Sequence, residues 1–99
     1  MVFGQMGDMI KQAREMQGKL KKIKEELKNA RYEAEKFGVK AVVDGEMEIK
    51  DLIVSPTVAP NQMTKLVKEV VNEALKKSKD DAAKKLKEAA GGLNIPGLG

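Results

Sequence analysis

Lysine and arginine side chains recur at regular intervals near the N-terminus. Arg14, Lys21 and Lys28 follow one another every seven residues, and Lys11 and Lys22 flank them. Seven residues are close to two helical turns, so on a helix these cations share one side. Such a row can follow a phosphate backbone by neutralising its charges. It can equally be a solvated face that keeps an amphipathic helix soluble, so both interpretations are open at this point.

A second set of lysines recurs in the C-terminal third of the chain. Within about one-third of a helical circumference lie Lys65, Lys68, Lys76, Lys79 and Lys87. Residues 1–30 hold seven basic and four acidic side chains, residues 31–57 hold four and six, and residues 58–99 hold eight and five. Two basic segments that flank an acidic one make a chance arrangement less plausible, so an anionic partner and simple solubility are about equally supported at this point.

The other side chains indicate which kinds of anion are the better candidates. Only Phe3, Tyr32 and Phe37 are aromatic, so no platform for stacking single-stranded bases is evident. Few Arg or Asn side chains are placed to read base edges. If the anion is a nucleic acid, the pattern favours a duplex over a single strand and gives only weak support to sequence-specific readout; binding through phosphates would depend strongly on salt.

The first basic row lies on a segment with an unbroken apolar seam. Intervals of three and four residues alternate along Met6, Met9, Ala13, Met16, Leu20, Ile23, Leu27 and Ala30. This spacing predicts a helix from Met6 to Ala30 that packs along one narrow stripe against another helix, either of the same chain or of a second copy. We expect a loose start over residues 1–7, with Asp8 as the N-cap.

The middle of the chain changes to the period of β-strands. We predict three antiparallel strands at about residues 31–37, 39–44 and 46–54, with a two-residue turn at Asp44-Gly45. Polar residues alternate with apolar ones, which indicates a sheet covered on one side only. Pro56 follows the third strand closely and ends it, because proline cannot donate to a strand ladder.

A second helix is predicted to begin at Pro60 or Asn61 and to stop at Gly91-Gly92. Its apolar face comprises Met63, Leu66, Val67, Val70, Val71, Ala74 and Leu75. The predicted architecture is therefore α+β, in the order helix, three-stranded antiparallel sheet, helix. Residues 1–99 form one domain, with flexible ends at 1–7 and 91–99.

Several functional classes are disfavoured by the residues that the sequence lacks. There is no cysteine and no histidine, so zinc hydrolases and triad enzymes are unsupported. Nucleotide-binding glycine motifs are also missing. The acidic pairs Glu33/Glu35, Glu46/Glu48 and Asp80/Asp81 are best explained as solvated surface. We therefore expect no enzyme activity, no metal and no cofactor. No secretory signal or membrane span is evident, so the cytoplasm is the expected compartment.

Four ordered motifs resemble the YbaB/EbfC family of nucleoid-associated proteins. They are Met9-Ile10-Lys11-Gln12-Ala13-Arg14-Glu15-Met16-Gln17, Val39-Lys40-Ala41-Val42-Val43-Asp44-Gly45, Leu52-Ile53-Val54-Ser55-Pro56 and Val71-Asn72-Glu73-Ala74-Leu75, followed by the ending Gly92-Leu93-Asn94-Ile95-Pro96-Gly97. The resemblance implies a tweezer-like homodimer with a shared central sheet that binds DNA in the bacterial cytoplasm and nucleoid. Ser55 replaces the aspartate that ends the third strand in the family pattern.

Two other functions remain as alternatives. The helix–strands–helix order also suits a prefoldin-like chaperone or a coiled-coil interaction scaffold, in which the methionine-rich seam would hold clients. Prefoldin arms are longer than either helix predicted here. An enzyme is the weakest alternative, since the usual catalytic side chains are missing.

Overall fold

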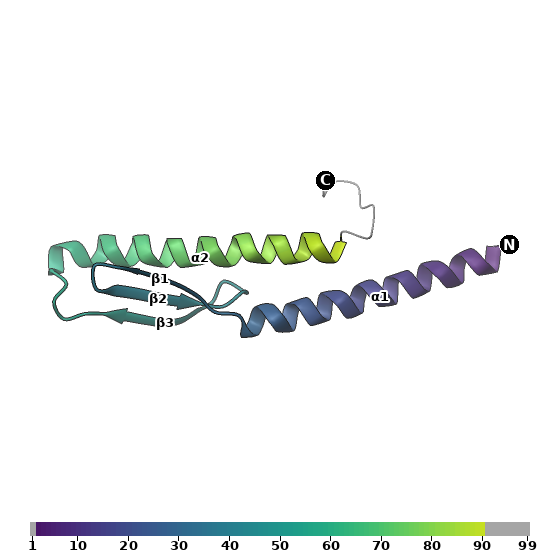
Figure 1. The fold of residues 1–99 in the computed structure, drawn as a ribbon, viewed down its shortest axis with the longest axis horizontal. Coiled ribbons are helices and arrows are strands. Elements are labelled where there is room, and N and C mark those ends of the chain that lie inside the picture. The colour runs from purple at the N-terminus through teal and green to yellow at the C-terminus, as the bar shows by residue number, and fades with distance from the viewer. Residues whose placement is uncertain (1, 91–99) are drawn as a thin grey trace.

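Two long helices precede and follow a small sheet: the C-terminal helix packs on one face of the sheet, and the N-terminal helix projects from its end (Figure 1). The computed structural model describes residues 2–90, with side chains from residue 7 onward. The elements are α1 (Val2–Asn29), β1 (Tyr32–Lys36), β2 (Val39–Val43), β3 (Ile49–Val54) and α2 (Pro60–Ala90) (Figure 1). This confirms the α+β class and the predicted order of elements.

The helix ends differ from the prediction at the N-terminus. Helix α1 begins at Val2, so the loose start expected over residues 1–7 is wrong from residue 2 onward. Asp8 lies inside the helix and is not its cap, because the residues before it continue the helix by more than a turn. Helix α2 begins at Pro60, as predicted. The predicted stop at Gly91-Gly92 and the flexible end at 91–99 lie outside the described residues.

The strands form an antiparallel sheet in the order β1-β2-β3. The tight hairpin turn is Phe37-Gly38, whose φ angles of 48° and 89° are both positive, as a type I′ turn requires. The turn predicted at Asp44-Gly45 is wrong. Residues 44–48 form a five-residue connection with Met47 at φ 65°, so β3 starts at Ile49 rather than at residue 46.

One face of the sheet packs against α2. Val39, Ala41 and Val43 alternate along β2 and are fully buried against α2, where Val70 and Ala74 are also fully buried. The opposite face is mainly polar and carries the exposed side chains of Glu33, Glu35 and Asp51, together with the exposed Ile53. The sheet is thus covered on one side, as its alternating pattern predicted.

The β2–β3 connection ties both helices together. The Oδ1 atom of Asp44 accepts hydrogen bonds from the backbone N–H groups of Glu46 (2.8 Å) and Glu48 (3.0 Å), which hold the pKa of this buried carboxyl below its usual value. Ser78 of α2 donates to the Asp44 carbonyl at 2.7 Å. On the other side, the Gly45 N–H donates to the Leu27 carbonyl of α1 at 2.7 Å. This loop therefore fixes where the C-terminal end of α1 sits.

The molecule is elongated, at 71 × 23 × 14 Å with a radius of gyration of 19.6 Å. A compact domain of this length would have a radius of gyration of about 13 Å. The difference arises because α1 leaves the end of the sheet as an arm and extends past the end of α2 (Figure 1). Among residues 2–90, neither helix is long and apolar enough to cross a membrane.

Candidate nucleic-acid interface

The first basic row lies on the arm formed by α1. All of its members are exposed: Lys11, Arg14, Lys21, Lys22 and Lys28. The ion pairs between described residues involve Lys36, Lys40, Lys50 and Lys85 and none of these five cations. From Lys11 to Lys28 the helix rises by about 25 Å, which matches roughly seven phosphates along one strand of DNA. The arm therefore carries unpaired positive charges over a length comparable to several successive phosphates of one DNA strand.

The apolar seam orients this row away from the core. Ile23 and Leu27 are buried beside α2 and the β2–β3 loop. Because Lys21 and Lys28 lie off the seam, they point to solvent when the seam packs inward. The predicted seam is confirmed as a packing stripe only in its C-terminal half, since Met9 is 68% exposed and Leu20 is 43% exposed.

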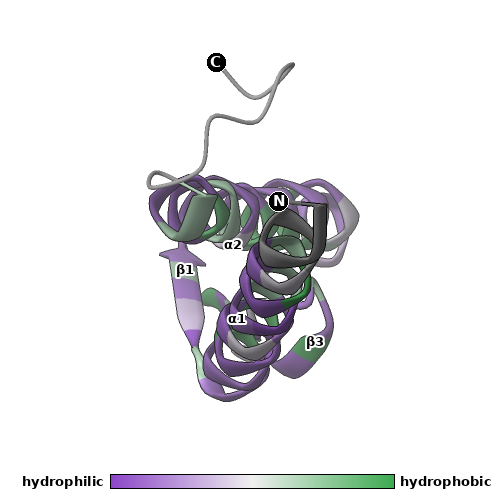
Figure 2. Cartoon of the chain, turned by 90° about the vertical axis from the view of Figure 1, so that its right-hand side faces the viewer, coloured by the Kyte–Doolittle hydropathy of each residue, from purple (hydrophilic) through white to green (hydrophobic). Residues whose placement is uncertain are grey.

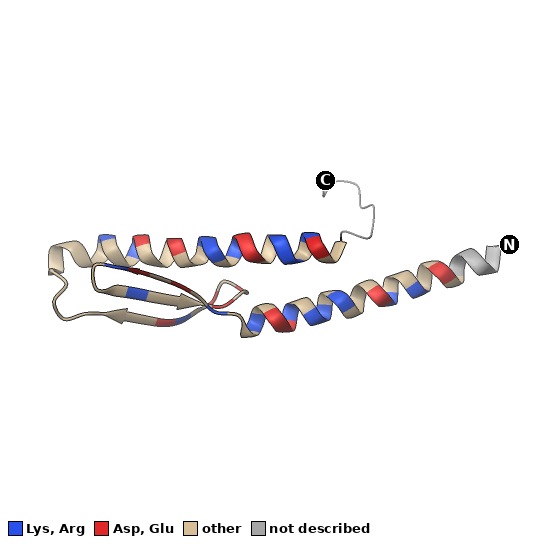
Figure 3. Ribbon diagram, in the orientation of Figure 1, with Lys and Arg blue, Asp and Glu red and all other residues tan. Residues whose placement is uncertain are grey.

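The second basic row lies on the outer side of α2. Lys65, Lys68, Lys76, Lys79 and Lys87 are all exposed, on the side opposite the buried stripe of Leu66, Val70 and Ala74. The row is spread over about 33 Å of helix. The lysines of α2 also alternate with Asp and Glu along the helix (Figure 3). The row is therefore more dilute than the one on the arm.

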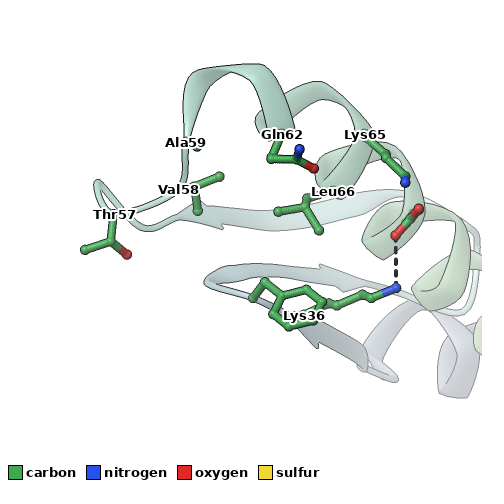
Figure 4. A pocket seen from close by; sticks show the side chains of 9 residues that line it. Lys36, Thr57, Val58, Ala59, Gln62, Lys65 and Leu66 are labelled. Atoms are coloured by element: carbon green, nitrogen blue, oxygen red, sulfur yellow. Dashed lines mark hydrogen bonds and ion pairs between the residues drawn. The ribbon is translucent and has the colours of Figure 1, made fainter.

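Lys65 lies at the end of the molecule far from the arm. It lines a hollow of about 370 Å³ together with Val58, Gln62 and Leu66 (Figure 4). An ion pair joins Lys36 and Glu69 there at 3.0 Å, and the hydrogen bond from Lys36 lowers the pKa of the Glu69 carboxyl. The ten predicted cations therefore do not form one patch on this chain.

A groove between α1 and α2 contains two cations that the sequence interpretation missed. Lys19, Lys22 and Lys85 line this hollow of about 360 Å³, together with Glu26 and Glu88. Lys85 also pairs with Asp81 at 3.3 Å. Lys19 and Lys85 are 66 residues apart, so only the packing of the two helices brings them together. In the sequence, the only indication that Lys19 lies in this groove was its position directly before Leu20 of the apolar seam.

The acidic pairs have two different environments. Glu33, Glu35, Glu46 and Glu48 are exposed, in agreement with a solvated surface. Among residues 2–90, no group of three acidic side chains is placed to hold a metal ion. Glu33 pairs with Lys40 at 3.6 Å and Glu48 with Lys50 at 3.4 Å, so part of this negative charge is compensated within the sheet and its loop.

Asp81 differs from the other acidic residues because it is half-buried and structural. It accepts a hydrogen bond from the Tyr32 hydroxyl, which joins β1 to α2. Burial, followed by this hydrogen bond, raises the pKa of Tyr32 to about 12. The interpretation of the Asp80/Asp81 pair as solvated surface is therefore wrong for Asp81.

Comparisons with known proteins agree on one family. The model of the YbaB/EbfC DNA-binding family matches residues 3–93. A nucleoid-associated protein of Thermoanaerobacter sp. is 38% identical, over 94% of this chain and 89% of its own. Those of Clostridium acetobutylicum and Desulforamulus reducens are 34% and 36% identical, over 96% and 99% of this chain and 90% and 99% of their own. The family is described by DNA binding rather than by a catalysed reaction. On this evidence the chain belongs to the YbaB/EbfC DNA-binding family.

Proposed function

We propose that this protein is a nucleoid-associated protein of the bacterial cytoplasm that binds double-stranded DNA as a homodimer, through phosphate contacts of low sequence specificity. The observation that carries the proposal is the exposed, unpaired basic row on the α1 arm. Its residues lie on the projecting part of the molecule, where a straight duplex can approach them. Family membership favours this function over the prefoldin-like alternative.

The proposed contact residues are expected to contribute unequally to the affinity for DNA. The row on α1 comes first. Lys87 lies at the same end of the molecule, but on the outer side of α2. Lys76 and Lys79 follow along α2, and Lys65 and Lys68 are the most remote. Lysine neutralises phosphate as a point charge, whereas Arg forms the bidentate contacts that read guanine. A set with nine lysines and one arginine therefore supports phosphate contacts without strong base readout.

An uncovered apolar surface on β3 supports the homodimer. Helix α2 packs over β1 and β2, so Ile49 and Leu52 on the same face of β3 remain 48% and 42% exposed. Figure 2 shows β3, in which apolar residues (green) stand beside hydrophilic ones (purple), at the side of the molecule away from β1. Val67 and Val71 extend the surface along α2, where they are half-buried. A second copy paired along β3 would continue the sheet and cover this surface, whereas an open apolar edge invites aggregation.

Dimerisation would change the strength of DNA binding. Each subunit contributes one arm, so a dimer offers two basic rows on one rigid body. Once the first arm is bound, the second binds at a high effective concentration. The dimer thus compensates for the modest charge of each row.

A titration of duplex DNA at increasing salt tests the proposed function. We expect the logarithm of the association constant to fall linearly and steeply with the logarithm of the salt concentration, with random and defined duplexes bound about equally. Single-stranded DNA of the same length serves as the control and should bind more weakly. Absence of binding at low salt, or binding unchanged by salt, would contradict the proposal. Suppression of client aggregation without DNA affinity would instead support the chaperone alternative.

The homodimer is tested by Leu52→Glu. A carboxylate on this face of β3 would be buried without a partner in the shared sheet, so the variant should sediment as a monomer while retaining its helical circular dichroism. Leu86→Glu is the matched control, because Leu86 is similarly exposed (45%) but lies near the far end of α2. It should remain dimeric. A dimeric Leu52→Glu variant would show that β3 is not the interface.

A further inference from the structure

The sheet has two edges, and α2 covers them differently. Strand β1 forms one edge and β3 the other, at opposite sides of the molecule (Figure 2). The edge of a sheet carries backbone N–H and C=O groups with which a strand of another chain can pair. What covers each edge therefore decides where this protein can associate with itself.

The hairpin fixes which backbone groups of β1 face outward. Its two-residue loop is closed by the pair Lys36 and Val39, and the closing pair of such a loop is hydrogen-bonded. Hydrogen-bonded and non-bonded pairs alternate along an antiparallel ladder. Every second residue of β1 therefore bonds to β2, and the backbone groups of Glu33 and Glu35 face away from the sheet.

Lys77 of α2 covers this outer edge of β1. Its Nζ atom donates to the outward carbonyl oxygen of Glu33 at 2.8 Å, although the two residues are 44 positions apart. Two more side chains on the same flank of α2 contact β1, in the pairs Glu69–Lys36 and Asp81–Tyr32. These polar contacts hold α2 along β1, so the Lys77 ammonium is positioned where an added strand would need the carbonyl.

The edge formed by β3 has no such cover from α2 among residues 2–90. On this side the flank of α2 carries Val67, Val71 and Leu75, which are half-buried and apolar. The outward N–H of Leu52 donates to the carboxylate of Asp51 at 2.9 Å. Asp51 is an exposed residue of the same strand, so a carbonyl from an added strand can replace its carboxylate. The two flanks of α2 thus close one edge with polar contacts and leave the other open and apolar.

We propose that Lys77 blocks strand pairing at β1, so that a second copy adds only at β3 and assembly stops at the homodimer. This inference rests on the homodimer of the proposed function. If β1 also accepted a strand, each dimer would keep two open edges and could extend into a chain of sheets. The carboxylates of Glu33 and Glu35 are a second barrier, because pairing two β1 strands would bring like charges together.

The test starts from a chain that lacks the second barrier. Glu33→Thr/Glu35→Thr places β-favouring residues on β1 and leaves Lys77 as the remaining barrier, so this background should sediment like the unaltered chain. Adding Lys77→Ala frees the Glu33 carbonyl. We expect larger assemblies to form at about tenfold lower protein concentration than in the background, which is the effect of about one net hydrogen bond. Sedimentation velocity without DNA measures their size.

Two controls identify the edge as the cause. Lys84→Ala in the same background removes an exposed lysine of α2 seven residues further on, and it should leave the size unchanged. Glu35→Pro, in place of Glu35→Thr, removes an outward N–H that the ladder with β2 does not use. It should therefore preserve the circular dichroism but abolish the assemblies that Lys77→Ala produces.

Three results would overturn the proposal. They are no larger assemblies with Lys77→Ala, equal assembly with Lys84→Ala, and assembly that persists with Glu35→Pro. All sizes are compared with that of the unaltered chain. The Leu52→Glu variant and the salt titration do not involve β1, so failure here is distinguishable from failure of the proposed homodimer or DNA binding.

Discussion

Replacing Lys21 and Lys28 by glutamate lowers the affinity for duplex DNA, by our expectation, on the order of 100-fold or more at low salt. In the proposed homodimer the double variant removes four cations and puts four anions in their place. Each lost phosphate contact reduces the slope of log affinity against log salt by about 0.9, so the slope should fall by about 3 to 4. Both side chains are exposed and off the packing stripe, so the fold should be unaffected.

The control for this experiment is Lys36→Glu/Lys40→Glu. It changes the net charge by the same amount but acts on the sheet, where these lysines pair with Glu69 and Glu33. We expect at most a small loss of DNA affinity from the control, measured by mobility shift alongside circular dichroism. Equal losses in both double variants would mean that net charge, rather than the α1 row, determines binding.

Gly45→Ala should destabilise the protein by about 2–4 kcal/mol. A Cβ atom at position 45 would lie 2.6 Å from the carbonyl oxygen of Leu27 and 2.7 Å from its Cα, and backbone atoms cannot move aside cheaply. Relief of the clash would break the hydrogen bond from Gly45 to Leu27 and release the end of α1. Denaturant unfolding measures the loss, and DNA affinity should fall with it because the arm is displaced.

Gly18→Ala is the matched control for this prediction. Gly18 lies inside α1, and a Cβ atom there would have no neighbour within 4 Å, so the added methyl group meets open space. Alanine favours helix over glycine, so the variant should gain up to about 1 kcal/mol. If Gly45→Ala were as stable as Gly18→Ala, the contact between the loop and α1 would not hold the arm.

The errors in the predicted sheet have one physical origin. Asp44-Gly45 has the composition of a tight hairpin turn, but neither residue adopts positive φ there. Position 45 requires glycine because Leu27 of α1 lies in direct contact with it. Position 44 requires a polar side chain because its carboxylate accepts hydrogen bonds from the loop amides. The positive φ angles fall instead on Phe37-Gly38 and on Met47. Gly45 is required because α1 packs closely against it, but in the sequence it looks like a glycine required by a local hairpin turn.

The elements that carry the candidate site were determined by the sequence alone. The three-and-four spacing predicts α1, alternation predicts the one-sided sheet, and Pro60 marks the start of α2. The outward position of Lys21 or Lys79 follows from the same periodicities. These features depend on neighbours within a few residues, so they can be read along the chain.

Only the tertiary structure decided which of these side chains lie together. Packing of Ile23 and Leu27 against α2 and the loop brings Lys19 near Lys85, and leaves Lys65 at the opposite end beside the Lys36–Glu69 pair. The same packing leaves Met9 and Leu20 without a partner and β3 without cover. Such relations depend on where a helix axis lies relative to a sheet, which is set by contacts between residues far apart in the chain and not by local periodicity.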